Sequence, residues 1–244
     1  MHVSVERLSK RFGRVVALDD VTFDVAPGQI VTVLGANGAG KTTLLRCLAG
    51  ILAPRAGEVR YDGEPFRRSR IDLRRRFGFL GDTPFVYPEM SPIRHAGMAV
   101  RLYGARRDGI EREVVDLLRQ FDLLPIAERP LKTLSRGQRY KAALVGLLAV
   151  DPEVWLLDEP FASGMDPRGL AAFRERSREA VGRGRTILYS TQILDVAERF
   201  SDRVCILHHG RVRAFDSVET LRHRVREADD VLEQVFAELD DEGP

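Results

Sequence analysis

The stretch GANGAGKT, residues 35–42, follows the apolar run IVTVLG and opens the helix-forming run KTTLLRCLAG. Its spacing meets the full pattern G-x-x-x-x-G-K-[ST], from Gly35 through Gly40, Lys41 and Thr42. Glycines let backbone N–H groups turn inward around phosphate oxygens, and the helix that follows points its positive dipole end at the same anion. A plain strand-to-helix turn explains one or two glycines but not this spacing. The stretch therefore predicts a nucleotide phosphate-binding loop.

Within this loop the side chains have separate predicted roles. Lys41 would reach the β- and γ-phosphates, and the Thr42 hydroxyl would face Mg²⁺, which prefers hard oxygen ligands. The other loop residues predicted to contact the nucleotide are Gly35, Asn37, Gly38, Ala39, Gly40 and Thr43.

The composition is that of an ordinary globular protein. The chain has 244 residues, 44% of them hydrophobic and 30% charged, which suits one large domain or a domain with a small subdomain. A net charge of +2 is too balanced to favour nucleic acid as a partner. Cys47 and Cys205 lie in apolar runs and are predicted to be reduced core residues.

Two observations bear on the membrane. The N-terminus, MHVSVERLSKRFG, has no apolar segment of the kind that a secretory signal needs. The longest apolar run, AALVGLLAV at 142–150, is far shorter than the roughly 20 residues of a spanning helix. We therefore expect that this chain does not itself cross a membrane.

Strand and helix patterns alternate along much of the chain. Strands are predicted at 3–8, 21–25, 29–35 and 57–63, then at 154–158, 186–190 and 203–207. Three predicted helices lie within 91–150: one capped by Ser91, one capped by Asp108, and one from near Ser135 to Val150. Further helices are predicted after the phosphate loop, from Asp166 to Gly182, and from about Ile193. The fold class predicted is α/β: a P-loop NTPase core with a mainly parallel sheet, an N-terminal antiparallel β part and an inserted helical subdomain.

The stretch LLDEP, residues 156–160, ends a predicted buried strand with two carboxylates. Two adjacent acids could simply cap a strand. Downstream of a phosphate-binding loop, however, they are typical of a Walker B motif, in which Asp158 holds the Mg²⁺ shell and Glu159 acts on a water molecule.

A third motif, LSRGQ at 134–138, begins a helix. Ser135 and Gly137 offer a hydroxyl and an unobstructed N–H at a helix N-terminus, which suits an anion. Many helices begin this way, so the pentapeptide gains its meaning from its position between the phosphate loop and LLDEP.

Together these motifs resemble the ATP-binding subunits of ABC transporters, over nearly the whole chain. GANGAGKTT resembles their Walker A motif, VWLLDEP their Walker B, LSRGQ their signature, and SGMD at 163–166 their D-loop. Phe12 stands where the family has an aromatic residue that stacks on adenine, and Arg136 stands where glycine is commonest in the signature. The resemblance implies ATP and Mg²⁺ as cofactors. It also implies head-to-tail dimers, in which Ser135, Gly137 and Gln138 would serve the partner's nucleotide.

Two positions depart from the family pattern. Asp82 stands where the family has the glutamine of the Q-loop, and Gln192 where it has the switch histidine. Asp82 still offers hard oxygens to Mg²⁺, on a shorter stem and with a negative charge. Gln192 can donate a hydrogen bond to a phosphate oxygen or orient water, but it cannot carry a positive charge. The catalytic residues predicted are thus Glu159, Gln192 and Lys41, and the metal ligands Thr42, Asp82 and Asp158.

The resemblance also implies partners and a location. The chain would be the ATP-hydrolysing subunit of a membrane transporter, peripheral on the cytoplasmic face of the inner (plasma) membrane. Its partners would be a transmembrane permease, which alone gives it membrane contact, and a second ATP-binding subunit, identical or different. Residues 91–133 and the Asp82 loop would dock on the permease.

The expected domains are an ABC ATP-binding domain at 1–225, with the helical subdomain inserted at about 91–150, and a helical tail at 226–244. The tail, VLEQVFAEL, resembles the C-terminal helix of exporters of drugs, lipids or polysaccharides.

Two alternatives remain at this point. A non-transport ABC ATPase usually carries two nucleotide domains or a long coiled-coil insertion, and this chain shows neither. A nucleotide-gated module with weak hydrolysis is suggested by Asp82 and Gln192, and opposed by the intact Glu159 and Lys41.

Overall fold

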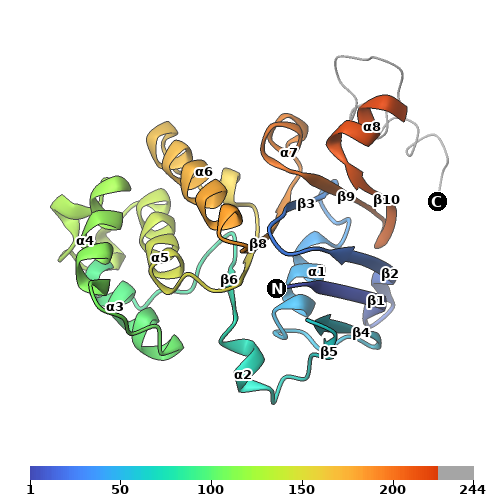
Figure 1. Cartoon of the computed structure of the whole chain (residues 1–244), viewed down its shortest axis with the longest axis horizontal. Helices are drawn as coiled ribbons and strands as arrows, with labels where there is room; N and C mark the ends of the chain where they lie inside the picture. The colour runs from blue at the N-terminus through green and yellow to red at the C-terminus, as the bar shows by residue number, and fades with distance from the viewer. Residues whose placement is uncertain (225–244) are drawn as a thin grey trace.

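A computed structural model describes residues 1–224 and shows an α/β protein built on two sheets. Figure 1 shows the helices α3, α4 and α5 gathered at one end and the antiparallel strands at the other, with the larger sheet between them. The predicted fold class, with a mainly parallel sheet, an antiparallel N-terminal part and a helical insert, is confirmed.

The larger sheet carries the phosphate loop. Its strand order is β10-β9-β3-β8-β7-β6, and all neighbouring pairs are parallel except β9 with β10. Because its central strands are covered on both faces, β3, β7 and β8 are buried at every position. The six strands are β3 (Ile30–Leu34), β6 (Phe77–Leu80), β7 (Val154–Leu157), β8 (Thr186–Thr191), β9 (Arg203–His208) and β10 (Arg211–Ser217).

The smaller sheet is antiparallel, in the order β2-β1-β4-β5. Its strands are β1 (Val3–Phe12), β2 (Val15–Val25), β4 (Ala56–Tyr61) and β5 (Glu64–Pro65), so the first two are longer than the sequence pattern predicts. Helix α1 (Lys41–Leu48) and both sheets contribute side chains to one hydrophobic core. That core fixes the helix that begins at the phosphate loop.

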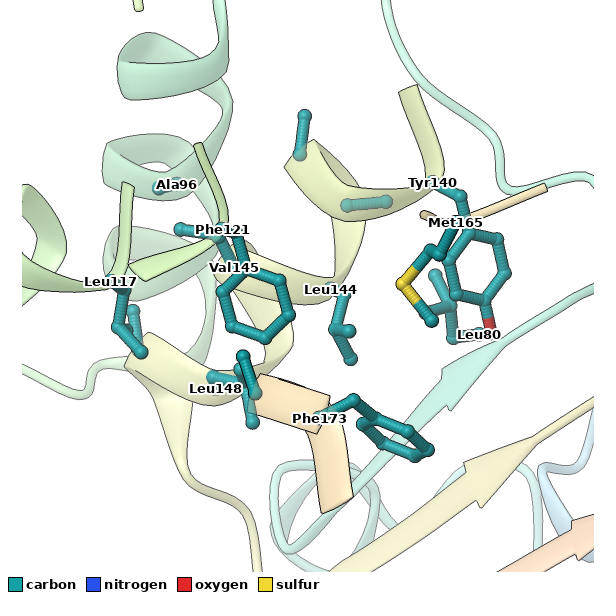
Figure 2. Packing of buried hydrophobic residues seen from close by; sticks show 14 of the residues in the cluster. Leu80, Ala96, Leu117, Phe121, Tyr140, Leu144, Val145, Leu148, Met165 and Phe173 are labelled. Atoms are coloured by element: carbon teal, nitrogen blue, oxygen red, sulfur yellow. The ribbon is translucent and has the colours of Figure 1, made fainter. Parts of the chain in front are cut away.

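The helical insert has its own arrangement. It comprises α3 (Pro92–Tyr103), α4 (Ile110–Gln120), the short helices η1 (Leu124–Ile126) and η2 (Leu131–Thr133), and α5 (Arg136–Val150). The core beneath it extends from Phe121 and Leu144 to Leu80 of β6 and Phe173 of α6 (Pro167–Gly182), as Figure 2 shows. The insert therefore packs against the sheet instead of forming a separate globule.

One predicted helix cap is wrong. Asp108 does not cap α4: the N-cap is Gly109, in a left-handed conformation with φ 79°, and no side chain bonds to the first turn. Glycine reaches this conformation without steric cost, so the helix can begin one residue later than an aspartate cap would place it. Ser91 does stand at the N-cap of α3, with Pro92 in the first turn, although no side-chain bond caps that helix.

The remaining elements of residues 1–224 are short helices. They are α2 (Ile71–Arg74), η3 (Pro160–Ala162), α7 (Leu194–Phe200) and α8 (Val218–Arg224). Cys47 and Cys205 are buried free thiols, as predicted. Among residues 1–224, no helix is both long and apolar enough to span a bilayer. The predicted tail at 226–244 lies outside the described residues, and the division at residue 225 stays a prediction.

The pairing of β1 with β4 generates a stability prediction. Gly57 has φ +77°, and a Cβ there would overlap the backbone carbonyl of Arg7. Gly63 has nearly the same dihedral, φ +79°, but open space around it. We expect Gly57→Ala to lower the free energy of unfolding by about 2–5 kcal/mol and the control Gly63→Ala by about 1–2 kcal/mol. Urea unfolding of both variants measures this, and equal losses would contradict the close approach of β4 to β1.

Candidate active site

The phosphate loop joins the end of β3 to the start of α1 and encloses the ammonium of Lys41. That side chain is 6% exposed, and its Nζ donates hydrogen bonds to the carbonyl oxygens of Gly35 at 2.7 Å and Ala36 at 3.1 Å. Gly40 has φ +108°, and a Cβ there would overlap the carbonyl of Ala17. Only glycine can bring the loop this close to β2, and the result is a narrow turn around one positive charge.

A cavity of about 340 Å³ opens in front of this loop. Three features that the sequence predicted separately line this cavity: the phosphate loop, Asp82 after β6, and Glu159 after β7. Its lining is Val15, Val16, Ala17, Asn37, Gly38, Gly40, Lys41, Thr42, Thr43, Asp82 and Glu159. The site is assembled where the carboxyl ends of parallel strands meet, which is the usual position of a ligand in an open α/β sheet.

Asp158 does not itself line the cavity but contacts Thr42, which does, and it is 1% exposed. Its Oδ1 accepts hydrogen bonds from Thr42 Oγ1 at 3.0 Å and from Ser190 Oγ at 2.7 Å. Two predicted Mg²⁺ ligands, Thr42 and Asp158, therefore touch each other. A hydroxyl beside a carboxylate fits Mg²⁺, which in nucleotide sites keeps most of its coordination for phosphates and water.

Within residues 1–224, no group of three or more His, Cys, Asp or Glu side chains is placed to hold a metal ion. A cage made only of protein ligands is therefore not a feature of the described part of the chain. The oxygen pair of Thr42 and Asp158 suits an ion that arrives with its nucleotide.

Glu159 is held in an unusual conformation. Its backbone has φ 49°, in the left-handed region, and its N–H donates to Ser190 Oγ at 3.0 Å. Its Oε1 lies 3.5 Å from Lys41 Nζ, whereas its Oε2 is buried and has no hydrogen-bond partner among residues 1–224. A non-glycine residue in this region stores strain, and such strain clusters at functional sites.

Burial is the main cause that raises the pKa of Glu159 above its ordinary value. The neighbouring Lys41 ammonium lowers the pKa, and the carboxylates of Asp158 and Asp82 raise it further. A carboxylate whose pKa is raised is a stronger base than an exposed one.

Gln192 follows β8 directly and is exposed. Because Thr191 pairs with Leu34 of β3, Gln192 lies at the same sheet edge as the phosphate loop, although it does not line the cavity. Phe12 is 47% exposed and also lies outside the cavity lining, while its register partner Val15 belongs to it.

The signature residues are not part of this cavity. Ser135 caps α5 in a reciprocal box: the Gln138 N–H donates to Ser135 Oγ at 3.2 Å, and the Ser135 N–H donates to Gln138 Oε1 at 2.9 Å. Gly137 lies so close to the carbonyl of Gly164 that any Cβ would overlap it. Nearby, Lys141 Nζ meets Asp166 Oδ2 at 2.8 Å. The signature and the 163–166 segment are therefore packed against each other, outside the lining of the phosphate-loop cavity.

Sequence reasoning missed two side chains of this region. Ser190 bonds to both Asp158 and the Glu159 N–H, and the signal for it was its place at the end of the strand TILYS, beside the Walker B strand. Lys141, which pairs with Asp166, had no comparable signal, because only the packing of α5 on the D-loop brings the two together.

Comparison with known proteins agrees with these motifs. Residues 18–162 match the family described as ABC transporter. The chain is 33% identical to the ABC-type transporter ATP-binding protein EcsA of Bacillus subtilis (strain 168), over 97% of this chain and 96% of that protein. It is 35% identical to the Nod factor export ATP-binding protein I of Paraburkholderia xenovorans (strain LB400), over 86% of this chain and 68% of that protein.

A solved structure of an ATP-binding subunit of an ABC transporter superposes with a TM-score of 0.91 at 33% identity, covering 98% of this chain and all of that one. The range matched by the family, residues 18–162, contains the segments 35–42, 134–138 and 156–160. The chain therefore belongs to the ABC transporter family, as an ATP-binding subunit that hydrolyses ATP.

Proposed function

We propose that this chain works in an exporter, in which two ATP-binding subunits enclose MgATP and a separate permease carries the cargo. The observation that carries the catalytic part is the carboxylate of Glu159. It lies against Lys41 in the nucleotide cavity, with Oε2 buried and without a partner. A strong base with an unused acceptor, next to a phosphate-binding lysine, suits the removal of a proton from water that attacks the γ-phosphate.

Nucleotide binding in this proposal begins with Lys41. Its ammonium now donates to two loop carbonyls, and phosphate oxygens would be stronger acceptors for the same protons. The loop N–H groups and the N-terminus of α1 add further donors. Val15 and Val16 would contact the base and sugar end of the cavity, together with Phe12 beyond it.

Mg²⁺ would be held by Thr42 Oγ1 and Asp158, together with Asp82, which also lines the cavity. When bound, the ion neutralises charge on the transferred phosphoryl group. The protein's own contribution is to fix Asp158 through Ser190 and the backbone of β6. Gln192, at the same sheet edge, would donate to a γ-phosphate oxygen or orient water.

The position of the signature supports a dimer. Ser135, Gly137 and Gln138 are absent from the lining of the chain's own cavity, and the hydroxyl of Ser135 lies at an exposed helix N-terminus. An anion site that the chain does not use for itself fits a nucleotide bound mainly by a second subunit. That subunit would be either another copy or a related chain.

A second cavity, of about 440 Å³, supports a permease partner. It lies between the insert and the sheet and is lined in part by Asp82, Phe85, His95 and Tyr103. Phe85 is 80% exposed and forms an edge-to-face pair with Tyr87. A cytoplasmic segment of the permease would cover these aromatic rings. Because Asp82 lines both this groove and the nucleotide cavity, movement in one would reach the other.

Export is favoured by the likeness to the Paraburkholderia relative, which is named a Nod factor export ATP-binding protein. The chain would act on the cytoplasmic face of the membrane, because ATP is found there, and would touch the membrane only through its permease. A translation or repair ATPase is the rival function, and co-purification with ribosomes instead of a membrane protein would favour it.

The role of Glu159 gives the first test. Glu159→Gln keeps the shape of the side chain but removes its basicity, so we expect MgATP binding to persist and turnover to fall about a hundredfold or more. Steady-state phosphate release and the mass of the MgATP-bound form measure these effects. Glu175→Gln, at an exposed position on α6, is the matched control. Wild-type turnover in Glu159→Gln would remove Glu159 from the mechanism.

Lys41→Ala tests the phosphate loop. The substitution removes the one formal positive charge that the loop encloses, so tight binding of ATP should be lost. Isothermal titration measures the loss, with the exposed Arg199→Ala as the control for removal of a cation. Micromolar affinity in Lys41→Ala would contradict the assignment.

Gln192 is tested by two substitutions. A charge-assisted hydrogen bond is about twice as strong as a neutral one, and a gain of about 1–2 kcal/mol in the transition state speeds turnover roughly five- to thirtyfold. Gln192→His should therefore raise turnover, and the gain should fade between about pH 6 and 7.5 as the imidazolium loses its proton. Gln192→Ala should reduce turnover with ATP affinity nearly unchanged. Equal activity of alanine and glutamine would show that this side chain has no catalytic role.

A further inference from the structure

Tyr140 carries a buried hydroxyl that none of the contacts described above uses. The side chain is fully buried in α5, two residues after the signature, and its Oη has no hydrogen-bond partner within the described residues. Buried tyrosine hydroxyls usually find a partner, and each exception needs an explanation. A bond that forms only in another state of the protein is one such explanation.

Two carboxylates near Tyr140 could accept a hydrogen bond from its hydroxyl: those of Asp158 and Asp82. Figure 2 shows its ring beside Leu80 and Met165, with the oxygen on the Leu80 side. Leu80 ends β6, two residues before Asp82, and its carbonyl accepts a hydrogen bond from the Asp158 N–H at 2.8 Å. The hydroxyl therefore faces the sheet edge where both carboxylates stand.

These two carboxylates differ in what they already bind. Asp158 Oδ1 accepts from Thr42 and Ser190. Asp82, in contrast, has no hydrogen bond or ion pair among the contacts of residues 1–224. Burial first, and then the charges of Asp158 and Asp82, raise the pKa of Tyr140 above its ordinary value. The phenol is thus always protonated near neutral pH and is available as a donor, and Asp82 is the acceptor with free capacity.

We propose that Tyr140 is a positioning residue for Asp82: when MgATP binds, the Tyr140 hydroxyl donates to the Asp82 carboxylate and holds it toward the nucleotide cavity. The proposal rests on the proposed function, in which Asp82 faces Mg²⁺. An aspartate has a short stem, and an exposed loop residue is otherwise free to turn away. A phenol anchored in the core supplies the fixed donor.

This bond would join two parts of the chain that serve different nucleotides. Tyr140 belongs to α5, whose N-terminus carries the signature, whereas Asp82 lines the chain's own phosphate cavity. Contact between the signature and the partner's nucleotide would therefore stabilise the position of Asp82 in this chain's own nucleotide cavity. The groove between insert and sheet, which Asp82 also lines, lies at the same junction.

The test uses the full-length chain carrying Glu159→Gln, so that ATP is bound without turnover. Tyr140→Phe removes only the hydroxyl. We expect it to raise the Kd for MgATP about three- to tenfold, to change the Kd for ATP in EDTA less than twofold, and to leave the unfolding temperature of the nucleotide-free protein equal or higher. In an Asp82→Ala background, Tyr140→Phe should have no further effect, because the acceptor is already absent.

Tyr61→Phe is the matched control. Tyr61 is also fully buried, but its hydroxyl already donates to the carbonyl of Leu48 at 2.8 Å. Its loss should lower the unfolding temperature and leave both dissociation constants unchanged. This pattern is the reverse of the one expected for Tyr140, so a purely structural tyrosine can be recognised.

Three results would overturn the proposal: an unchanged Kd for MgATP in Tyr140→Phe, an equal loss in EDTA, or the same loss in the Asp82→Ala background. If the Glu159→Gln parent binds neither ATP nor MgATP, the proposed function itself is wrong and this proposal falls with it. Normal ATP binding by the parent together with any of the three results is the failure of the Tyr140 assignment alone.

Discussion

The organisation of this protein depends on one buried carboxylate, Asp158. Its side chain accepts from Thr42 at the start of α1 and from Ser190 on β8, and its N–H donates to Leu80 on β6. Four segments far apart in the sequence are thereby fixed at one sheet edge. Because a buried charge is costly unless its bonds are satisfied, these contacts must form together. The geometry of the nucleotide cavity follows from that requirement.

Two residues near Asp158, Glu159 and Lys41, are held in energetically unfavourable states. Glu159 takes a left-handed conformation, and the buried Lys41 ammonium has two loop carbonyls and one carboxylate oxygen as its polar partners among the described residues. These features lower the stability of the protein locally, and the burial of strands β3, β7 and β8 offsets that loss. The cavity thus suits an anion. Phosphate oxygens would accept stronger hydrogen bonds from Lys41 than the loop carbonyls do, and they would also be stabilised by the N-terminus of α1.

The helical insert is fixed to the rest of the protein by its core and by the contact of the signature with the D-loop. Its core is continuous with that of the sheet, from Phe121 through Leu144 to Leu80 and Phe173. The signature at the start of α5 is fixed on the D-loop through the close approach of Gly137 to Gly164. The chain therefore carries a phosphate loop and a signature at separate places, because Ser135, Gly137 and Gln138 do not line the phosphate-loop cavity, and this separation supports the proposed function in pairs.

The sequence by itself predicted the phosphate loop and the acidic pair from local spacing: glycines where the backbone turns, and carboxylates where an apolar strand ends. It predicted the fold class from the alternation of strand and helix patterns, and the signature from its position between the other two motifs. It also located the departures at Asp82 and Gln192. Only the tertiary structure decided which side chains meet. Ser190 on Asp158, Lys141 on Asp166 and the unpaired hydroxyl of Tyr140 all depend on the packing of α5 and the register of β7 with β8. Contacts between distant segments leave no periodic signal in the chain, because their partners are chosen by the core that brings them together.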